Sequence, residues 1–153
     1  MTKLELKKNY IFRIEKILKL DDNSEYFLLI NPLGERNLMS TAYYADYHFT
    51  VGQEISARID KINCQGRLFI EPEHPFFKIS QTYLFNFLGK EKICKKNNKW
   101  INVLILLDEL GEKQHLEAKD WQMSKSYLPE KLRCKVLGLK KSKLILEYIE
   151  ELK

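Results

Sequence analysis

The stretch YFLLINPLGER at residues 26–36 recurs 77 positions later in the chain, as VLILLDELGEK at residues 103–113. Five apolar residues align with five apolar residues, and the Leu-Gly-Glu and basic residue that close each stretch align as well. The same offset continues downstream, where it aligns Ile55, Ala57 and Ile59 with Leu132, Cys134 and Val136. Apolar, glycine and charged positions matching in one register indicate two copies of one fold.

Each copy has the pattern of short β-strands separated by turns. Ile55, Ala57 and Ile59 alternate with polar residues, which is the period of a strand with one buried face. Asn, Asp, Gly, Pro and Ser cluster between the apolar runs, as they do in turns. The expected strands are residues 10–20, 26–31, 36–40, 53–62 and 67–71 in the first copy, and 83–94, 100–108, 113–117, 131–137 and 143–149 in the second.

The connection between the third and fourth strands is longer than the others. In the first copy it covers residues 41–49, long enough for one helical turn, and residues 119–127 occupy the same place in the second. Five strands with an interruption at this point follow the order of the OB (oligonucleotide/oligosaccharide-binding) fold. We therefore expect an all-β protein of two tandem five-stranded OB-fold barrels, in residues 1–76 and 77–153. An immunoglobulin-like sandwich is the rival fold, but it needs more strands per unit.

The stretch VGQEISARIDKINCQGRLFIE at residues 51–71 resembles the last two strands of the RNA-binding repeats of the ribosomal protein S-one type. Those repeats show a Val-Gly start, an alternating strand, a short loop and a final strand introduced by Gly-Arg-Leu. Residues 128–147 are a weaker version, with Pro129-Glu130 where Gly52-Gln53 stand in the first copy. The resemblance implies an OB fold and an RNA-binding function.

Charge is distributed unevenly over the two copies. Residues 1–76 carry 10 Lys and Arg against 11 Asp and Glu, whereas residues 77–153 carry 16 against 10, within a net charge of +5. The first copy is thus nearly neutral and the second is basic, a difference that bears on partners rather than on fold.

The lysines of the second copy gather at two expected turns, around residues 90–99 and 140–143. In OB barrels these two loops flank the ligand face, so we expect the lysines to meet at one rim beside Trp100. Cations for phosphates and flat rings for bases are what single-stranded nucleic acid requires. We predict that single-stranded RNA, or DNA, binds with weak sequence selectivity. The predicted contacts are Lys90, Lys92, Lys95, Lys96, Lys99, Trp100, Lys140, Lys141, Lys143 and Tyr83.

Other interpretations of these residues stay open. Loop lysines are often simply solvated, and Trp100 could be a core residue at the start of a strand. The first copy has an aromatic group after its third strand, Tyr43, Tyr44, Tyr47, His48 and Phe49. These rings could stack on bases, but the alignment of Tyr44 with Trp121 favours a plug at the end of the barrel. If the first copy has a partner, a protein is as strong a candidate as RNA.

No motif for catalysis, metal binding or a cofactor is present. The three histidines, His48, His74 and His115, lack metal-site spacing, and we interpret His74 as a linker residue. The three cysteines are scattered, which excludes the paired spacing of zinc sites and disulfide frameworks. We therefore predict a non-enzymatic, cytoplasmic protein without metal, cofactor or membrane segment. A protein–protein adaptor of a larger assembly is the alternative, and a regulatory fragment of a longer enzyme is a weaker one.

Overall fold

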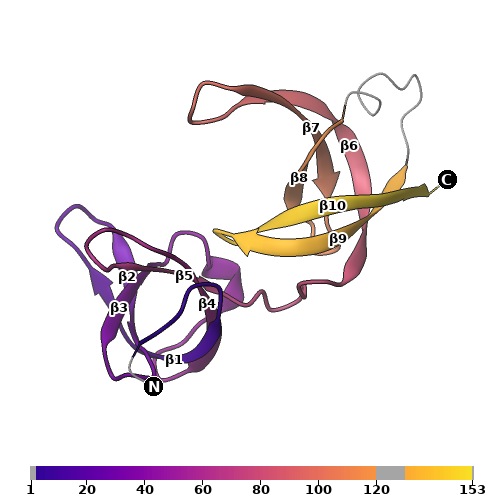
Figure 1. The fold of residues 1–153 in the computed structure, drawn as a ribbon. Helices are drawn as coiled ribbons and strands as arrows, with labels where there is room; N and C mark the ends of the chain where they lie inside the picture. Colours follow the sequence, from indigo (N-terminus) through magenta and orange to yellow (C-terminus); the bar gives the residue numbers. More distant parts are fainter. Residues whose placement is uncertain (1–2, 120–129, 153) are drawn as a thin grey trace. The chain divides into compact units, whose positions relative to one another are not determined.

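The computed structural model describes residues 3–119 and 130–152, and it divides the chain into two compact units. Unit 1 is Met1–Phe76 and unit 2 is Phe77–Lys153. Each unit consists of one five-stranded antiparallel sheet (Figure 1). The expectation of an all-β chain with two five-stranded halves is therefore confirmed.

The order of strands within the sheet is the same in both units. Unit 1 has the order β3-β2-β1-β4-β5, and unit 2 has the equivalent order β8-β7-β6-β9-β10. The strands of unit 1 are β1 (Asn9–Lys19), β2 (Glu25–Ile30), β3 (Arg36–Ser40), β4 (Glu54–Ile62) and β5 (Leu68–Pro72). Those of unit 2 are β6 (Thr82–Cys94), β7 (Trp100–Leu107), β8 (Lys113–Glu117), β9 (Lys131–Lys140) and β10 (Lys143–Leu152).

The strand bounds agree with the sequence prediction to within a residue, except in β9 and β10. These two strands continue to Lys140 and Leu152, beyond the expected ends at residues 137 and 149. Gly138 follows the expected end of the strand at residue 137, yet it is buried in β9 and pairs with Ile145. A glycine inside a strand often marks a bulge, and the β9–β10 register shifts at this point.

One long strand in each unit pairs with two partners in succession. The first half of β6 pairs with β9 and the second half with β7, and β1 pairs with β4 and β2 in the same way. A bulge follows shortly after each change of partner, between Ile14 and Lys16 in β1 and between Phe87 and Gly89 in β6. A bulge bends and twists its strand, so each sheet is coiled. The end of the β6–β7 hairpin projects away from the other strands of unit 2 (Figure 1).

Among the described residues neither sheet is closed by hydrogen-bonded strand pairing, so each has two edge strands. In unit 2, side chains link the edges: the Lys143 Nζ donates to the Lys113 carbonyl (3.2 Å), and the Leu144 N–H donates to the Gln114 Oε1 (3.0 Å). The edges of unit 2 thus lie within side-chain reach of each other.

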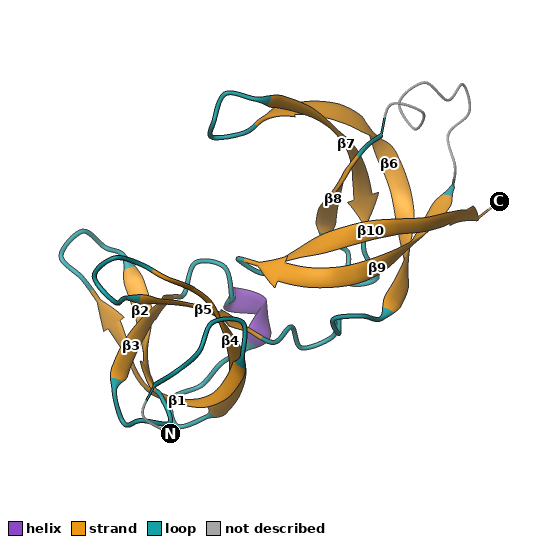
Figure 2. Ribbon diagram, in the orientation of Figure 1, coloured by secondary structure: helices purple, strands orange, loops and turns teal. Residues whose placement is uncertain are grey.

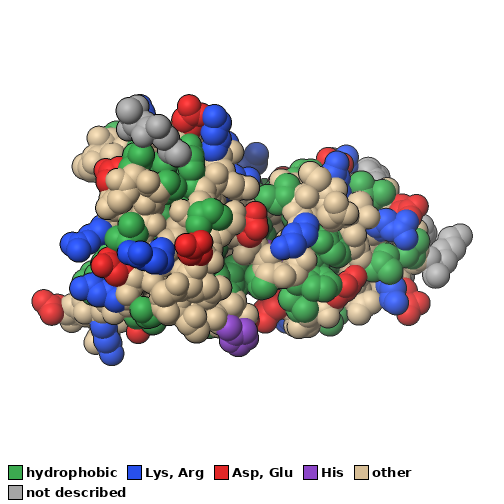
Figure 3. All heavy atoms as spheres, turned by 90° about the horizontal axis from the view of Figure 1, so that it is seen from below, with side chains coloured by type: hydrophobic (Ala, Val, Ile, Leu, Met, Phe, Trp, Pro, Cys, Tyr) green, Lys and Arg blue, Asp and Glu red, His purple; other side chains and the backbone are tan. Residues whose placement is uncertain are grey.

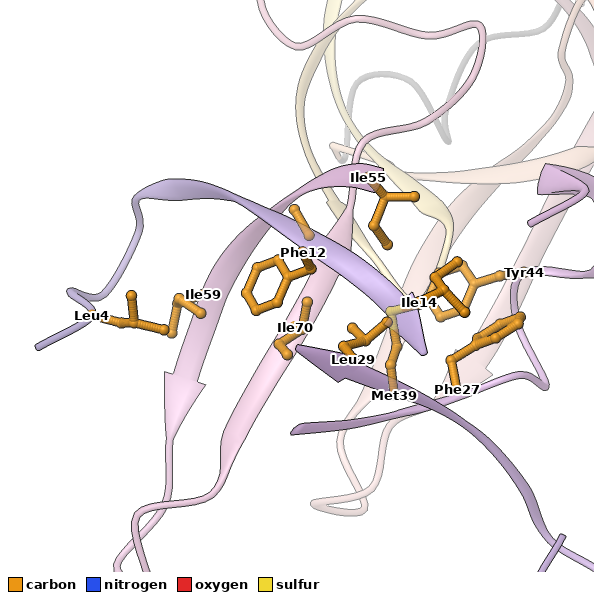
Figure 4. Close-up of a cluster of buried hydrophobic side chains, with 11 residues drawn as sticks. Leu4, Phe12, Ile14, Phe27, Leu29, Met39, Tyr44, Ile55, Ile59 and Ile70 are labelled. Atoms are coloured by element: carbon orange, nitrogen blue, oxygen red, sulfur yellow. The ribbon is translucent and has the colours of Figure 1, made fainter. Parts of the chain in front are cut away.

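Each unit has its own hydrophobic core, on one face of its sheet. In unit 1 Phe12, Ile14, Leu29 and Ile59 are completely buried (Figure 4). In unit 2 the core includes Phe85, Leu106, Leu132 and Val136, which come from three strands. The alternation of Ile55, Ala57 and Ile59, repeated at Leu132, Cys134 and Val136, predicted the inward positions of β4 and β9, and all six residues are buried.

The two units share irregular backbone features as well as strands. The Asn31 Oδ1 accepts the N–H groups of Leu33 (2.9 Å) and Glu35 (3.0 Å). The Asp108 Oδ1 accepts those of Leu110 and Glu112 (both 2.9 Å). Gly34 and Gly111 follow in these turns with φ angles of 80° and 86°, which favour glycine. Such correspondence outside the strands supports duplication of one fold.

The expected helical turn in the first copy is present as a 3₁₀ segment, Ala45–Tyr47 (Figure 2). The corresponding expectation for residues 119–127, with Trp121, lies almost entirely outside the described residues. Within residues 3–119 and 130–152, no helix has the length and hydropathy that a bilayer crossing would require.

Candidate nucleic-acid interface

The β6–β7 hairpin brings Trp100 onto the same face as two of the predicted lysines. Across the ladder, Trp100 is opposite Cys94, Asn102 is opposite Lys92, and Leu104 is opposite Lys90. Directly opposed residues in an antiparallel pair point to the same face, and side chains two positions apart along a strand share it. The face of the hairpin that carries the buried Leu104 therefore also carries Lys90, Lys92 and Trp100.

Trp100 is open to solvent rather than packed in the core. Its side chain is 65% exposed, the largest value among the exposed large hydrophobic residues of the described chain. Indole rings are usually among the most buried groups of a protein, so an exposed one on a strand is a candidate contact surface.

The turn that joins β6 to β7 is held by its own backbone. The Lys95 N–H donates to the Lys99 carbonyl and the Asn98 N–H to the Lys95 carbonyl, both at 2.9 Å. The Lys99 N–H also donates to the Asn97 Oδ1 (3.1 Å). The turn uses no lysine ammonium group, so Lys95, Lys96 and Lys99 extend exposed from a defined backbone.

Among the described residues, one lysine of this turn forms an ion pair. The Lys95 Nζ lies 3.9 Å from a Glu117 carboxylate oxygen, and both side chains are largely exposed. An exposed pair of this length stabilises the fold little and is screened by salt, so it would give way readily to a phosphate.

The second lysine group stands on the tight turn between β9 and β10. Lys140 and Lys143 pair across the hairpin. Lys141 and Ser142 form the turn with φ angles of 49° and 64°. Positive φ at both central residues defines the type I′ turn, which normally contains Asn and Gly. A Lys-Ser sequence is therefore strained in this turn.

The strand register separates the two lysine groups along the sheet. The β6–β7 turn follows the C-terminal end of β6, whereas β9 pairs with the N-terminal end of β6 and then runs on past Thr82 to its own turn. The two groups are therefore at opposite ends of β6, and only coiling of the sheet can bring them toward one ligand. A shared rim remains a prediction, whereas the group around Trp100 follows from the register.

Tyr83 has a packing role in unit 2. Its hydroxyl oxygen accepts the Lys78 N–H (2.8 Å), and its ring contacts that of Phe77 at a centroid distance of 4.8 Å. In unit 1, Tyr10 accepts the Glu5 N–H in the same way (2.9 Å). The same hydrogen bond thus forms near the start of the first strand in both units. This structural role makes Tyr83 a weaker candidate for stacking than Trp100.

Three members of the aromatic group of unit 1, Tyr44, Tyr47 and Phe49, pack in or against its core, as the alignment of Tyr44 favoured, whereas Tyr43 and His48 are exposed. Tyr44 is 4% exposed, and its hydroxyl donates to the Glu71 Oε1 (3.1 Å). Burial, reinforced by the Glu71 charge, raises the pKa of both Tyr44 and Tyr47 above the ordinary phenol value. The Tyr47 ring also contacts Phe49 and His74. These rings therefore close one end of the sheet core.

The interpretation of His74 as a linker residue is wrong. Its side chain is 9% exposed, and its Nδ1 accepts the Phe76 N–H (3.0 Å). Nearby, Pro72 belongs to β5 rather than to an extended linker. A proline fits there because β5 is an edge strand, and both Pro72 and His74 belong to unit 1.

Unit 1 also contains a cationic and aromatic group that the sequence pattern does not reveal. Lys61 and Arg67 both lie close to the ring of Phe69 on the β4–β5 hairpin. The pairing of Lys61 with Phe69 depends on a bulge after Ile59, and bulge positions cannot be read from alternation alone.

Charged side chains elsewhere are mixed in sign. Figure 3 shows basic and acidic side chains interspersed with apolar ones on the face it presents. Among the described residues no three His, Cys, Asp or Glu side chains come together as metal ligands would.

Comparison with known proteins gives no family for this chain. No family model matches it, and no curated protein matches it in a sequence search.

Proposed function

We propose that this protein binds single-stranded nucleic acid, RNA in preference to DNA, through the β6–β7 hairpin of unit 2. The observation that carries the proposal is the open indole of Trp100 on the same face as Lys90 and Lys92, next to the turn that contains Lys95, Lys96 and Lys99. Aromatic rings stack on bases of any sequence, and ammonium groups neutralise phosphates. Binding by such groups is tolerant of sequence.

We further propose that each sheet is an OB-type barrel. Pairing of the first strand with both the second and the fourth supports this. The bonds from Lys143 and Leu144 to strand β8 also support it, because they link the two edges of the sheet. In an OB barrel the second and third strands carry the ligand, flanked by the first and last hairpin loops. On this basis the side of the binding face opposite the β6–β7 turn would be formed by Lys140, Lys141 and Lys143.

The binding test is fluorescence anisotropy of a labelled strand of about 15 nucleotides, within the footprint of one or a few OB folds. Trp100→Ala should weaken binding by about 5- to 150-fold, since a stacked base contributes ~1–3 kcal/mol. Trp100→Phe should restore most of the affinity because it keeps a flat ring. Leu110→Ala, at another exposed apolar side chain of unit 2, is the matched control and should have no effect.

Charge is tested separately by salt dependence. The variant Lys96→Glu with Lys99→Glu should lower the slope of log affinity against log salt by about 1.4, at ~0.7 for each phosphate contact. Lys16→Glu with Lys19→Glu changes the net charge equally, on unit 1, and should leave most of the slope intact. Absence of binding to RNA and DNA at low salt would refute the proposal and favour a protein–protein adaptor.

A further inference from the structure

Unit 1, although nearly neutral, contains an exposed ring with two cations beside it. Phe69 is 42% exposed on β5. The Lys61 Nζ lies 5.7 Å from the centroid of its ring and the Arg67 Cζ lies 5.4 Å from it. Both distances are within the range of cation–π attraction, which holds the cations beside the ring.

The backbone fixes this arrangement. A register shift after Ile59 separates the inward pair Ile59–Ile70 from the pair Lys61–Phe69. Lys61 and Phe69 therefore share the outer face of the β4–β5 hairpin, while Ile59 and Ile70 remain in the core. At the turn, the Asn63 Oδ1 accepts the N–H groups of Gln65 (3.0 Å) and Arg67 (2.9 Å), which fixes the point from which the Arg67 side chain leaves.

The positive charge of this group is not cancelled by neighbouring acids. Within the described residues, neither Lys61 nor Arg67 forms an ion pair. The nearest acid in sequence, Asp60, is engaged by Arg58, at 2.9 Å to both Nε and Nη2, and by Lys7 at 3.7 Å. Two cations and a flat ring thus remain open to a ligand on one hairpin.

We infer that Lys61, Arg67 and Phe69 form a second binding site for single-stranded nucleic acid. A base stacks on the ring of Phe69, and the phosphates on either side of it pair with the ammonium and guanidinium groups. The inference rests on the proposed function for the class of ligand, but not on Trp100 or its lysines. Complementary charge selects a polyanion over a neutral apolar partner.

Two sites in one chain have a measurable consequence. A strand long enough to occupy both binds more tightly than a short one, because the second contact becomes intramolecular. Loss of either ring should then reduce the affinity for a long strand more than that for a short strand.

The test is an NMR titration of the full chain with an oligouridylate of about 6 nucleotides, near the lower limit of an OB site. The backbone amides of Lys61, Arg67 and Phe69 should shift in the wild type, and also in a Trp100→Ala, Lys96→Glu, Lys99→Glu variant. In that background Phe69→Ser should weaken the remaining binding at least about fivefold, as expected for one stacked base. Phe69→Tyr should retain it, and Ile11→Ser, at an exposed apolar residue on β1, is the control.

The outcomes separate this inference from the proposed function. Shifts confined to unit 2 would overturn the second site and leave the Trp100 site standing. Shifts confined to the Phe69 hairpin would support the second site and overturn the Trp100 site. Absence of shifts in both units, or residual binding that Phe69→Ser leaves unchanged, would also overturn the second site.

Discussion

At the scale of single residues, burial decides which reactive side chains can act. Cys64 and Cys94 are exposed, whereas Cys134 is fully buried in the core of unit 2. Burial raises the pKa of the Cys134 thiol to about 12. Since the thiolate is the reactive form, Cys134 should be almost inert at pH 8.

A thiol titration with a chromogenic disulfide tests this difference. Two thiols should react quickly in the native protein, and the third only after denaturation. Cys64→Ser and Cys94→Ser should each remove one fast thiol. Three fast thiols in the native protein would show that Cys134 is accessible, and the packing described for unit 2 would be wrong.

The buried carboxylate of Glu71 makes the hydroxyl of Tyr44 important for stability. Tyr44→Phe keeps the ring in the core but removes the donor to the Glu71 Oε1. Loss of one partner of a buried hydrogen bond costs about 1–3 kcal/mol, so the free energy of unfolding in urea should fall by that amount. Tyr43→Phe is the control, because Tyr43 is exposed. Equal stability of the two variants would contradict the role given to Tyr44.

At the scale of elements, the β9–β10 turn is strained for reasons of residue type. Replacing Lys141-Ser142 with Asn-Gly supplies the residues that a type I′ turn prefers. We expect the free energy of unfolding to rise by about 1–2 kcal/mol, the range of well-placed turn substitutions. Lys140→Asn removes a charge without changing the turn residues and should not raise stability. No gain from Asn-Gly would mean that the turn does not have this conformation.

The tip of the β6–β7 hairpin has little support from neighbouring strands in the described part of unit 2. The last pair between β7 and β8 is Val103–Glu117, and the Ala118 N–H donates to the Asn102 carbonyl (2.8 Å). Beyond these, residues 93–101 pair only with each other among the described residues. A two-stranded ribbon is marginally stable by itself.

Hydrogen exchange measures this difference within one strand. The amide of Ile101 should exchange at least about 100-fold faster than that of Leu106, which lies between β6 and β8. Addition of single-stranded RNA should slow exchange at the tip if Trp100 and the turn lysines bind it. Uniform protection along β7 would contradict a separately opening tip.

The elements differ in how well their sequence specifies them. The alternation of Ile55, Ala57 and Ile59 and the repeat at 77 residues predict strands and their inward faces, because both reflect burial along one chain. Register shifts are not predicted, because a bulge depends on the partner strand. The Phe69 group was not predicted for this reason. The separation of the lysine turns was not predicted because it depends on which end of β6 pairs with β9 and which with β7.

At the scale of the whole molecule, the two units share their strand order and turn hydrogen bonds but differ in their surface charge. The Asn31 turn and the Asp108 turn keep the same acceptor geometry, and Tyr10 and Tyr83 keep the same backbone bond. The hairpin loops differ: the last turn is Asn63-based in unit 1 and a lysine-rich type I′ turn in unit 2. The hydrogen bonds common to both units thus stabilise the fold, and charge differs between the units at loop positions that the fold does not constrain.

This division predicts that the two units fold as separate proteins. Each has its own core, and no strand of one sheet pairs with a strand of the other in the described chain. Units of this size bury enough apolar surface to fold alone, though with modest stability. Fragments 1–76 and 77–153 should therefore give dispersed NMR spectra whose core amides, such as those of Ile14 and Val136, match the full chain.

Charge then separates the folded fragments. Fragment 77–153, with 16 basic against 10 acidic residues, should elute from a sulfated polyanion column at higher salt than fragment 1–76, with 10 against 11. The structural reason is that the described basic residues of unit 2 are exposed or half-buried, on strands as well as on turns, so the core does not need them. If fragment 77–153 folds only when fragment 1–76 is added, the core of unit 2 is incomplete by itself and independent duplication of the fold is refuted.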